Sequence, residues 1–375
     1  MEPADQLQDL ADRQLLRQLH AISPLPSPHL EREGQPLLNF SSNDYLGLSQ
    51  HPALVEAALR ATRDYGTGAT ASRLICGSLQ IFHELEERIA DLKGTEAALS
   101  FSSGTACAAG CLPVIVGKGD TVLADKLSHA CLLDAARASG ATLRIFPHNH
   151  LGKLEHLLQS SSEGPGRTLI LTESVFSMDG DLAPLTDLCA LKEKYGALLW
   201  LDEAHALGVL GPRGLGLAEE RGLGAKVNFQ MGTLGKAVGS AGGYLAASRS
   251  WIDLFINRAR TFIFSTAPPA AQAAASLAGL EIISSQEGKN LRRHLDHLRQ
   301  KFDAPSAIIP LILGESEAAL AASATLIKAG FYLPAIRYPS VPRKQARLRL
   351  TLTASHQEEH LETLHQTLST LDLLP

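Results

Sequence analysis

The sequence has no excess of basic charge. Its 375 residues carry 34 Lys and Arg against 39 Asp and Glu, which gives a net charge of -5 at pH 7. Proteins that bind nucleic acid draw much of their affinity from lysine and arginine side chains that displace counterions from phosphates. We therefore expect no nucleic-acid partner.

Long apolar runs are also missing. No run approaches the roughly 20 residues that a helix needs to cross a bilayer. The N-terminal stretch MEPADQLQDLADRQLLRQLH is amphipathic and lacks a basic start followed by an apolar core. These absences predict a cytoplasmic protein with no membrane partner.

Cysteine is scarce and shows no pattern. The cysteines are odd in number, and none has the paired CxxC spacing or the histidine-rich neighbourhood that marks a zinc site. We expect no metal, and we expect these residues to be small buried apolar side chains in a reducing compartment. The positions are Cys76, Cys107, Cys111, Cys131 and Cys189.

Between residues 41 and 270, short apolar runs alternate with helical periodicities. The runs include TVLAD, TLILTE and ALLWLD, and the helical stretches include FHELEERIADLKG and LTDLCALKEKYG. Runs that are apolar throughout indicate strands buried on both faces, and their alternation with helices predicts an α/β fold with a mostly parallel sheet covered by helices. Ligands of such sheets bind at the carboxyl ends of the strands.

The chain is too long for one core, so we expect domains. Residues 1–40 are predicted to form a helical segment and the linker SPLPSPHLEREGQP, residues 41–270 a large domain, and residues 271–375 a smaller α+β domain. In the small domain, the alternating ARLRLTLT predicts a strand with Arg347 on a solvated face. The stretch SHQE predicts a helix start capped by Ser355.

The most informative stretch is LLWLDEAHALG, at residues 198–208, where an apolar strand ends in two acids and a histidine. DEAH suits the magnesium site of an NTPase, but that class needs a phosphate loop. The GK of MGTLGKAVGSAGG has Gln230 in place of the first loop glycine and Ala237 in place of Ser or Thr. A dinucleotide-binding protein is excluded as well. GTGATA, which begins at Gly66, fits the loose glycine-rich fingerprint of that class, but it follows a helical pattern, whereas the fingerprint must follow a strand.

A lysine, a strand-end aspartate and a histidine together suit pyridoxal phosphate. A lysine amine forms a Schiff base with the aldehyde of this cofactor, and a buried carboxylate keeps the pyridine nitrogen protonated so that the ring accepts electrons from a carbanion. Asp202 ends its strand and suits the second role. His205 is placed to reach the ring hydroxyl, and Lys236 follows the next predicted strand in a glycine-rich turn.

The phosphate and the ring faces of this cofactor need partners of their own. ALSFSSGTACAAG is a strand followed by a helix start, whose amides favour an anion, with Gly104 and Thr105 as candidates. His129 stands where the next strand gives way to a helix, and it is a candidate to stack on the ring. Ser177 and Thr233 are hydroxyls at further strand ends, suited to the ring oxygen or the phosphate.

Several motifs in chain order make the sequence resemble the α-oxoamine synthase family. They are NFSSNDYLGL, LSHACLLDAAR, ESVFSMDGD, DEAHALGVLG, GTLGKAVGSAGGY and FSTAPPA, and the resemblance covers nearly the whole chain. It implies the aminotransferase fold type I of pyridoxal phosphate-dependent transferases. It also implies that the catalytic residues are Lys236, Asp202, His205 and His129. The resemblance implies that Thr266 reaches the cofactor phosphate of the neighbouring subunit. It therefore also implies a homodimer with shared active sites.

The resemblance further implies a set of substrate-binding residues, in which Arg337 clamps a substrate carboxylate. The set is Arg17, Asn43, His129, Arg337, Ser340 and Arg349. Three residues depart from the family pattern: Ala71 stands where glycine is commoner, Gln80 where histidine is commoner, and Ser340 where threonine is commoner.

Within the family, NFSSNDYLGL and AIRYPSVP followed by ARLRLTLT favour the branch that joins L-alanine to a pimeloyl thioester with loss of CO2. This is an acyltransferase reaction of biotin biosynthesis. The donor stays open between pimeloyl-CoA and a pimeloyl carrier protein. Two alternatives remain: a sister activity that joins glycine to an acyl-CoA, and a non-catalytic subunit of a synthase heterodimer, which the presence of Lys236 disfavours.

Overall fold

The computed structural model describes residues 2–162 and 164–373. The chain divides into two compact units. Unit 1 comprises Met1–Gly47, Met178–Gly180 and His294–Pro375, and unit 2 comprises Leu48–Ser177 and Asp181–Arg293. The domain boundaries expected at residues 40 and 270 stay predictions.

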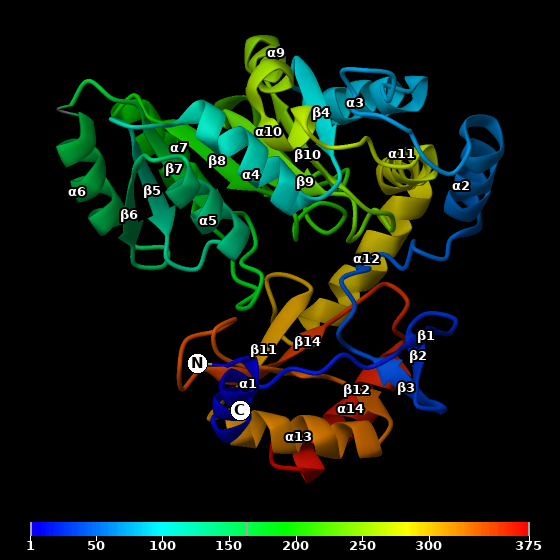
Figure 1. Ribbon diagram of the computed structural model, residues 1–375. Helices are drawn as coiled ribbons and strands as arrows, with labels where there is room; N and C mark the ends of the chain where they lie inside the picture. The colour runs from blue at the N-terminus through cyan, green and yellow to red at the C-terminus, as the bar shows by residue number, and fades with distance from the viewer. Residues whose placement is uncertain (1, 163, 374–375) are drawn as a thin grey trace. The chain divides into compact units, whose positions relative to one another are not determined.

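Unit 2 is built on a seven-stranded sheet with the strand order β4-β10-β9-β8-β7-β5-β6 (Figure 1). The strands from β9 to β6 run parallel, and β10 runs antiparallel to both of its neighbours. The predicted mostly parallel sheet is therefore confirmed. In sheet order the strands are β4 Ala97–Phe101, β10 Gly243–Ala247, β9 Phe229–Thr233, β8 Leu198–Asp202, β7 Thr168–Glu173, β5 Thr121–Asp125 and β6 Thr142–Phe146.

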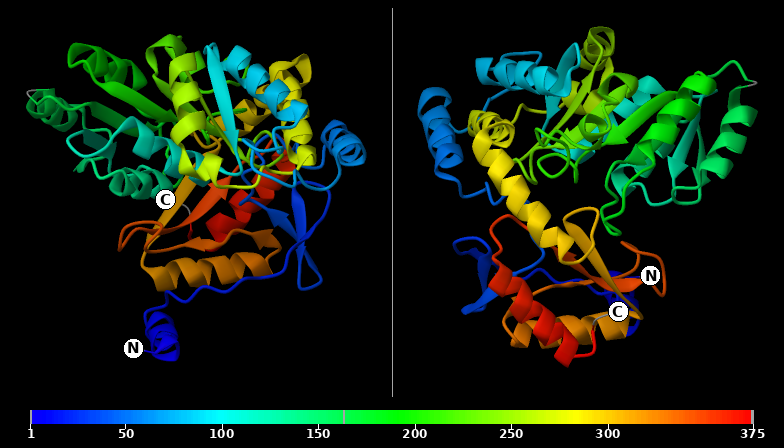
Figure 2. Two further views of the ribbon diagram at one scale, coloured as in Figure 1. Left: turned by 45° about the horizontal axis from the view of Figure 1, so that its top comes forward. Right: turned by 180° about the vertical axis from the view of Figure 1, so that it is seen from behind.

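Helices cover the sheet of unit 2. In Figure 1, α4 and α5 lie over one face, and the view from behind in Figure 2 shows the green helices α6 and α7 over the other. None of the described helices is long and apolar enough to cross a membrane. The helices are α2 Pro52–Tyr65, α3 Gln80–Lys93, α4 Gly104–Ile115, α5 Ala130–Ala138, α6 Leu151–Ser162, α7 Leu185–Lys194, α8 Leu217–Glu220, η1 Gly224–Lys226, α9 Arg249–Arg258, α10 Arg260–Ile263 and α11 Ala270–Ser284, followed by α12 Gln286–Gln300, in which the boundary with unit 1 falls.

The inner strands β5, β7, β8 and β10 of unit 2 are mostly apolar and buried, because they are covered on both faces. Trp200 of β8 and Phe229 of β9 are fully buried, and they share one core with Cys107 and Leu112 of α4. Burying a phenylalanine side chain contributes about 1.5–3 kcal/mol. This packing fixes the strands, and it therefore also holds in place the residues at their carboxyl ends.

Unit 1 contains two smaller sheets together with helices, a mixed α+β arrangement. One sheet has the order β1-β2-β3-β12 and the other β11-β14-β13. The strands are β1 Ser23–Pro24, β2 His29–Arg32, β3 Gln35–Asn39, β11 Ile308–Gly314, β12 Phe331–Tyr332, β13 Ala335–Ile336 and β14 Ala346–Thr351. The helices are α1 Pro3–Asp12, α13 Ser316–Lys328 and α14 Glu358–Thr370.

The linker prediction is wrong in part, because residues within it form a hairpin. β2 and β3 pair antiparallel, with Arg32 opposite Gln35 next to the turn. The turn residues Glu33 and Gly34 have φ angles of 54° and 80°. Two positive φ angles in a two-residue turn match the twist of the flanking strands. Gly34, which lies within the predicted linker, is therefore the glycine of a hairpin turn.

The start of α14 also differs from the prediction. The helix begins at Glu358, and its N-cap is Gln357 rather than Ser355. Gln357 forms a capping box with His360, whose Nδ1 accepts a hydrogen bond from the Gln357 amide at 3.1 Å. The box therefore lies two residues further along the chain than the SHQE pattern indicates.

Arg347 contradicts the expectation of a solvated strand face. Its side chain is 2% exposed, and Nη1 donates to Asp179 Oδ1 at 2.8 Å and to the Met178 carbonyl at 3.1 Å. β14 is the central strand of its sheet, so a charged side chain on it needs a partner inside the protein. Strand periodicity alone does not reveal that partner.

The cysteines are free, and most of them match the expectation of burial. Cys107, Cys111 and Cys189 are buried and Cys131 is partly buried. Cys76 is exposed, so the prediction is wrong for this residue. It lies in the loop that precedes α3.

Candidate active site

Three neighbouring parallel strands of unit 2 end in acids. Asp125 ends β5, Glu173 ends β7 and Asp202 ends β8, and all three are buried. Glu173 and Asp202 are direct partners in the register of β7 with β8. Parallel strands share one carboxyl edge, so the fold gathers these carboxylates at the edge where ligands bind.

Asp202 is a buried carboxylate with the lysine Lys236 as a cationic neighbour. Its Oδ1 accepts a hydrogen bond from the Ala204 amide at 2.9 Å, which fixes the side chain at the strand end. Burial raises the pKa of the Asp202 carboxyl, and the positive charge of Lys236 acts in the opposite direction. A cation placed against this carboxylate would favour its ionised form.

Lys236 and His205 meet in the turns that follow β9 and β8. Lys236 Nζ lies 2.7 Å from His205 Nε2, within hydrogen-bond distance. His205 is buried, whereas Lys236 is partly exposed. The Lys236 turn is closed by hydrogen bonds from the Gly239 amide to the Lys236 carbonyl at 2.8 Å and from the Leu234 amide to the Gly242 carbonyl at 2.9 Å. The turn thus holds an amine beside an imidazole, near a buried carboxylate.

His129 is the N-cap of α5, as the strand-to-helix pattern predicts. Its Nδ1 accepts a hydrogen bond from the Cys131 amide at 3.2 Å. Burial lowers the pKa of His129, Asp202 opposes this shift, and the charge of Lys236 adds to it. A lowered pKa favours the neutral ring, and a neutral imidazole with its Nδ1 tied to the backbone presents a fixed aromatic face.

Gly104 is the first residue of α4, and Ser103 caps the helix by accepting a hydrogen bond from the Ala106 amide at 3.0 Å. Thr105 is exposed in the same turn. Gly243 lies against this turn so closely that a Cβ on it would come within 2.6 Å of the Gly104 nitrogen. First-turn amides have no partner inside their own helix, so this turn suits an anion.

The remaining cofactor candidates have different environments. Ser177 is buried, and its amide donates to Glu173 Oε2 at 3.2 Å. Thr233 Oγ1 donates to the Gly242 carbonyl at 3.0 Å and accepts from the Gly235 amide at 3.2 Å, so this hydroxyl stabilises the Lys236 turn. Thr266 is exposed and forms an isolated bridge with Ser72.

Two predicted substrate residues meet in unit 1. Arg349 is buried, and its Nη1 donates to Asn43 Oδ1 at 3.1 Å and to Thr351 Oγ1 at 2.9 Å. The Asn43 oxygen also accepts from the Tyr45 hydroxyl at 3.2 Å. The roles of Arg349 and Asn43 in substrate binding stay predictions.

The other substrate candidates of unit 1 surround its N-terminal segment. The Arg337 guanidinium donates to the carbonyls of Gln14 and Leu16, and Arg17 Nη2 donates to the Tyr338 carbonyl at 3.4 Å. Burial lowers the pKa of Arg337, and the nearby charge of Arg17 adds to this shift. The contacts do not bring Ser340 to either guanidinium: Ser340 is exposed, and its amide donates to the Arg337 carbonyl at 3.0 Å.

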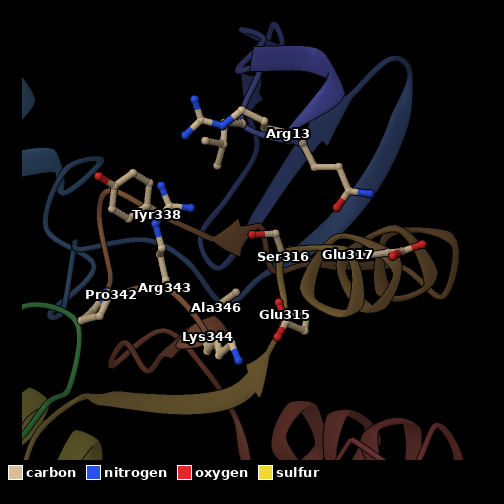
Figure 3. A pocket seen from close by; sticks show the side chains of 11 residues that line it. Arg13, Glu315, Ser316, Glu317, Tyr338, Pro342, Arg343, Lys344 and Ala346 are labelled. Carbon is tan, nitrogen blue, oxygen red and sulfur yellow. The ribbon is translucent and has the colours of Figure 1, made fainter. Parts of the chain in front are cut away.

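A cavity of about 460 Å³ lies beside these residues in unit 1 (Figure 3). The Arg343 guanidinium lies over the Tyr338 ring, 4.5 Å from its centre. Glu315 and Glu317 line the cavity as well, so its wall carries charges of both signs. This mixture does not select an anion or a cation as a ligand.

Sequence reasoning missed Glu173 and Asp125. Burial and the adjacent Asp202 charge raise the pKa of the Glu173 carboxyl well above its usual range. Glu173 Oε1 is buried and has no hydrogen-bond partner among the described residues. The signal was present, because TVLAD and TLILTE end in an acid as ALLWLD does.

The side chains at this edge of unit 2 fit pyridoxal phosphate. The donor set combines a lysine amine 2.7 Å from an imidazole, a buried carboxylate with a cationic neighbour and a helix N-terminus for an anion. An aldehyde, a ring nitrogen and a phosphate are the matching groups of that cofactor. Lys236, Asp202 and the first turn of α4 would hold them.

The chain belongs to the aminotransferase class I and II family, which matches residues 35–368. It is 47% identical to the 8-amino-7-oxononanoate synthase of Geobacter sulfurreducens over 371 residues, which cover 96% of this chain and 95% of the relative. These similarities confirm the resemblance to the α-oxoamine synthases and the use of pyridoxal phosphate.

Solved structures of the same group are similar over nearly the whole chain. A serine palmitoyltransferase from S. paucimobilis, with a bound adduct of pyridoxal phosphate and myriocin, has a TM-score of 0.90 at 25% identity and covers 99% of this chain and 98% of that one. An 8-amino-7-oxononanoate synthase from Francisella tularensis has a TM-score of 0.74 at 25% identity and covers 89% and 98%. The predicted fold type is therefore confirmed.

Proposed function

We propose that the protein catalyses the decarboxylative condensation of L-alanine with a pimeloyl thioester to give 8-amino-7-oxononanoate in biotin biosynthesis. A carbon–carbon bond forms between the alanine α-carbon and the thioester carbonyl, the thiol of CoA or of a carrier protein leaves, and the alanine carboxylate leaves as CO2. The proposal depends on one observation: Lys236, His205 and Asp202 lie together at the carboxyl edge of the sheet. The 47% identity to a synthase of that name supports it.

The residues of unit 2 divide the work between proton transfer and charge stabilisation. Bound pyridoxal phosphate supplies an aldehyde for an amine and a protonated ring that accepts an electron pair from the substrate α-carbon. Lys236 Nζ takes the α-proton and returns a proton after CO2 has left. His205, 2.7 Å from that amine, orients it. Asp202 holds a positive charge on the ring nitrogen.

Other groups bind rather than react. His129 presents its neutral ring face for stacking, and the first-turn amides of α4 with Thr105 bind the phosphate. Ser177 is assigned to the ring oxygen. Arg337 is assigned to the alanine carboxylate, because a guanidinium binds a carboxylate with two parallel hydrogen bonds.

The amino-acid substrate provides the test of the proposal. The purified protein, supplied with pyridoxal phosphate and pimeloyl-CoA or pimeloyl carrier protein, should form 8-amino-7-oxononanoate from L-alanine at least about tenfold faster than it forms the corresponding product from glycine. Mass spectrometry of the products measures both rates. Preference for glycine would replace the proposal by the sister activity, and no product from either amino acid would favour a non-catalytic subunit.

We also propose that the protein is a homodimer. Ile75 is 80% exposed and Phe264 is 70% exposed, and their segments adjoin through the hydrogen bond from the Ala267 amide to the Ala71 carbonyl at 3.0 Å. Large exposed apolar side chains on neighbouring segments support the presence of an interface. A second copy would cover them and bring Thr266 towards the partner's phosphate, and Ala71 would lie near the contact.

Sedimentation velocity tests the homodimer. The wild-type protein should sediment at twice the monomer mass, and Ile75→Asp should shift the equilibrium towards the monomer because it places a charge in an apolar contact. Leu7→Asp is the matched control, since Leu7 is a 53% exposed leucine of the N-terminal helix. A wild-type monomer at micromolar concentration would contradict the homodimer.

The proposed location is the cytoplasm. Five free cysteines are typical of a protein kept in a reducing compartment. Cell fractionation followed by immunoblotting checks the location, and recovery of the protein outside the cytoplasmic fraction would overturn it.

A further inference from the structure

A polar cluster of unit 2 outside the proposed catalytic residues surrounds His148. The imidazole lies in the loop after β6, with Nδ1 3.0 Å from Asp125 Oδ1 and Nε2 2.7 Å from Asp181 Oδ2. Asp125 ends β5, whereas Asp181 lies past the end of β7. One side chain therefore joins two segments that are far apart in the sequence.

Asp181 belongs to a short hairpin that also carries Ser177. We define the Ser177 hairpin as residues 174–177 and 181–183. Its two sides are joined by the bridge of Val175 with Leu182. The Phe176 amide donates to the Asp181 carbonyl at 3.0 Å. Ser177 is the next residue after Phe176, so a group that fixes Asp181 also fixes the backbone next to Ser177.

Two further contacts join this hairpin to the same loop. The His148 ring meets the Phe176 ring edge to face, with 4.3 Å between centres. Asn149 Nδ2 donates to Asp181 Oδ2 and to the Leu182 carbonyl, each at 3.1 Å. The Asn149 amide donates to Asp125 Oδ2 at 2.8 Å. The loop thus holds the hairpin by its side chains and is itself anchored to the end of β5.

The chemistry of these contacts requires a charged imidazole. Ionised carboxylates only accept hydrogen bonds, so both ring nitrogens of His148 must carry protons to donate to Asp125 and Asp181. Burial lowers the pKa of His148, but the hydrogen bonds with the two aspartates outweigh this and raise it to about 10. The imidazolium is therefore retained through the neutral range. A charge-assisted bond on each side makes the link directional.

We propose that His148 is a positioning residue of the cofactor site: by bridging Asp125 and Asp181, it holds the Ser177 hairpin so that the Ser177 hydroxyl is fixed for the cofactor. The inference rests on the proposed function through the role given to Ser177. In this role His148 acts through another residue. An ordinary ion pair at the surface would contribute little and would leave the cofactor site unchanged.

The test measures the mobility of the Ser177 hairpin and the affinity for the cofactor separately. Both are measured in His148→Ala and in Asp181→Asn. The second variant keeps the shape of the side chain and therefore serves if the alanine variant does not fold. Hydrogen exchange of peptides covering residues 174–183 in the protein without added cofactor reports on the hairpin. Titration with pyridoxal phosphate, followed by absorbance, reports on the site. We expect faster exchange in those peptides and about tenfold weaker cofactor binding, with a shifted absorbance maximum, since charge-assisted hydrogen bonds are lost.

A double-mutant cycle with Ser177→Ala shows whether His148 acts through Ser177. In the Ser177→Ala background, His148→Ala should weaken cofactor binding by less than about twofold, because the hydroxyl that it positions is already absent. His297→Ala is the matched control, since it removes another imidazole 2.7 Å from a carboxylate, that of Glu358, and it should change neither readout.

Two results would overturn the inference: unchanged exchange in residues 174–183 of both variants, or losses in cofactor binding that add fully across the cycle. Failure of the proposed function is a different result, in which the wild-type protein binds pyridoxal phosphate but forms no 8-amino-7-oxononanoate. The exchange and binding measurements would still decide the role of His148 in that case.

Discussion

Replacing Lys236 by alanine should abolish formation of 8-amino-7-oxononanoate and leave the fold intact. The amine lies 2.7 Å from His205 Nε2 at the edge of the sheet, and alanine can neither bond the cofactor aldehyde nor carry the α-proton. The side chain is partly exposed in a turn held by backbone hydrogen bonds, so its loss leaves no large cavity. Mass spectrometry of the product and its rate of formation measure the loss of activity. The circular dichroism spectrum and the melting temperature measure whether the fold is intact.

Covalent trapping makes the Lys236 test independent of turnover. Borohydride reduction should attach the cofactor to the wild-type protein at Lys236 and should not label Lys236→Ala. Lys194→Ala is the control, because Lys194 is an exposed lysine paired with Glu155 at 2.7 Å and its removal should change neither labelling nor rate. Turnover at more than a trace in Lys236→Ala would defeat the assignment of the reacting amine.

Replacing Asp202 by asparagine should lower kcat/KM by about 10³-fold, because a neutral amide does not stabilise a positive charge on the ring nitrogen. The amide oxygen can still accept from the Ala204 amide, as Oδ1 does now at 2.9 Å. Burial raises the pKa of the Asp202 carboxyl, so ionisation of this group costs stability, and the asparagine variant should be at least as stable without cofactor. Steady-state kinetics and thermal unfolding measure the two effects.

Glu203→Gln is the matched control, and we expect it to lower stability while the rate is retained. Glu203 is the next residue and is also fully buried, but its oxygens accept from the amides of Leu217 at 3.0 Å and Ala218 at 2.9 Å, and Lys93 Nζ lies 4.0 Å away. Its neutralisation should lower the melting temperature, because the buried Lys93, which still donates to the Leu215 carbonyl at 2.7 Å, then loses a carboxylate counter-charge. The rate per folded molecule should be retained. Equal rate losses in both variants would show that buried charge in general, and not Asp202 in particular, supports the reaction.

Local sequence patterns were sufficient for the parts of the site that lie at strand ends. ALLWLD predicts that an acid follows a buried strand, and the structure places Asp202 there. His129 falls at the junction of a strand and a helix, and it is the N-cap of α5. Each of these placements depends only on one strand and the residues at its end. Hydrophobic periodicity and turn-forming residues are therefore enough to predict them.

The environments of other residues could not be predicted in this way. Arg347 alternates with leucines, so its pattern matches a solvated face, but it is buried against Asp179. Glu173 ends a predicted strand as Asp202 does, but only the strand order makes the two carboxylates direct neighbours. In each case a partner from a distant part of the chain decides the environment.

The sequence by itself therefore determined the fold class, the cofactor chemistry and the family, because each depends on residue types at fixed short spacings. The tertiary structure decided which of those residues share a charge, a proton or a hydrogen bond. In the sheet, β5 lies beside β7 although β6 separates them in the sequence, and His148 bridges Asp125 and Asp181 across this arrangement. Pairings of this kind follow from the order of strands, which the spacing of residues along the chain does not specify.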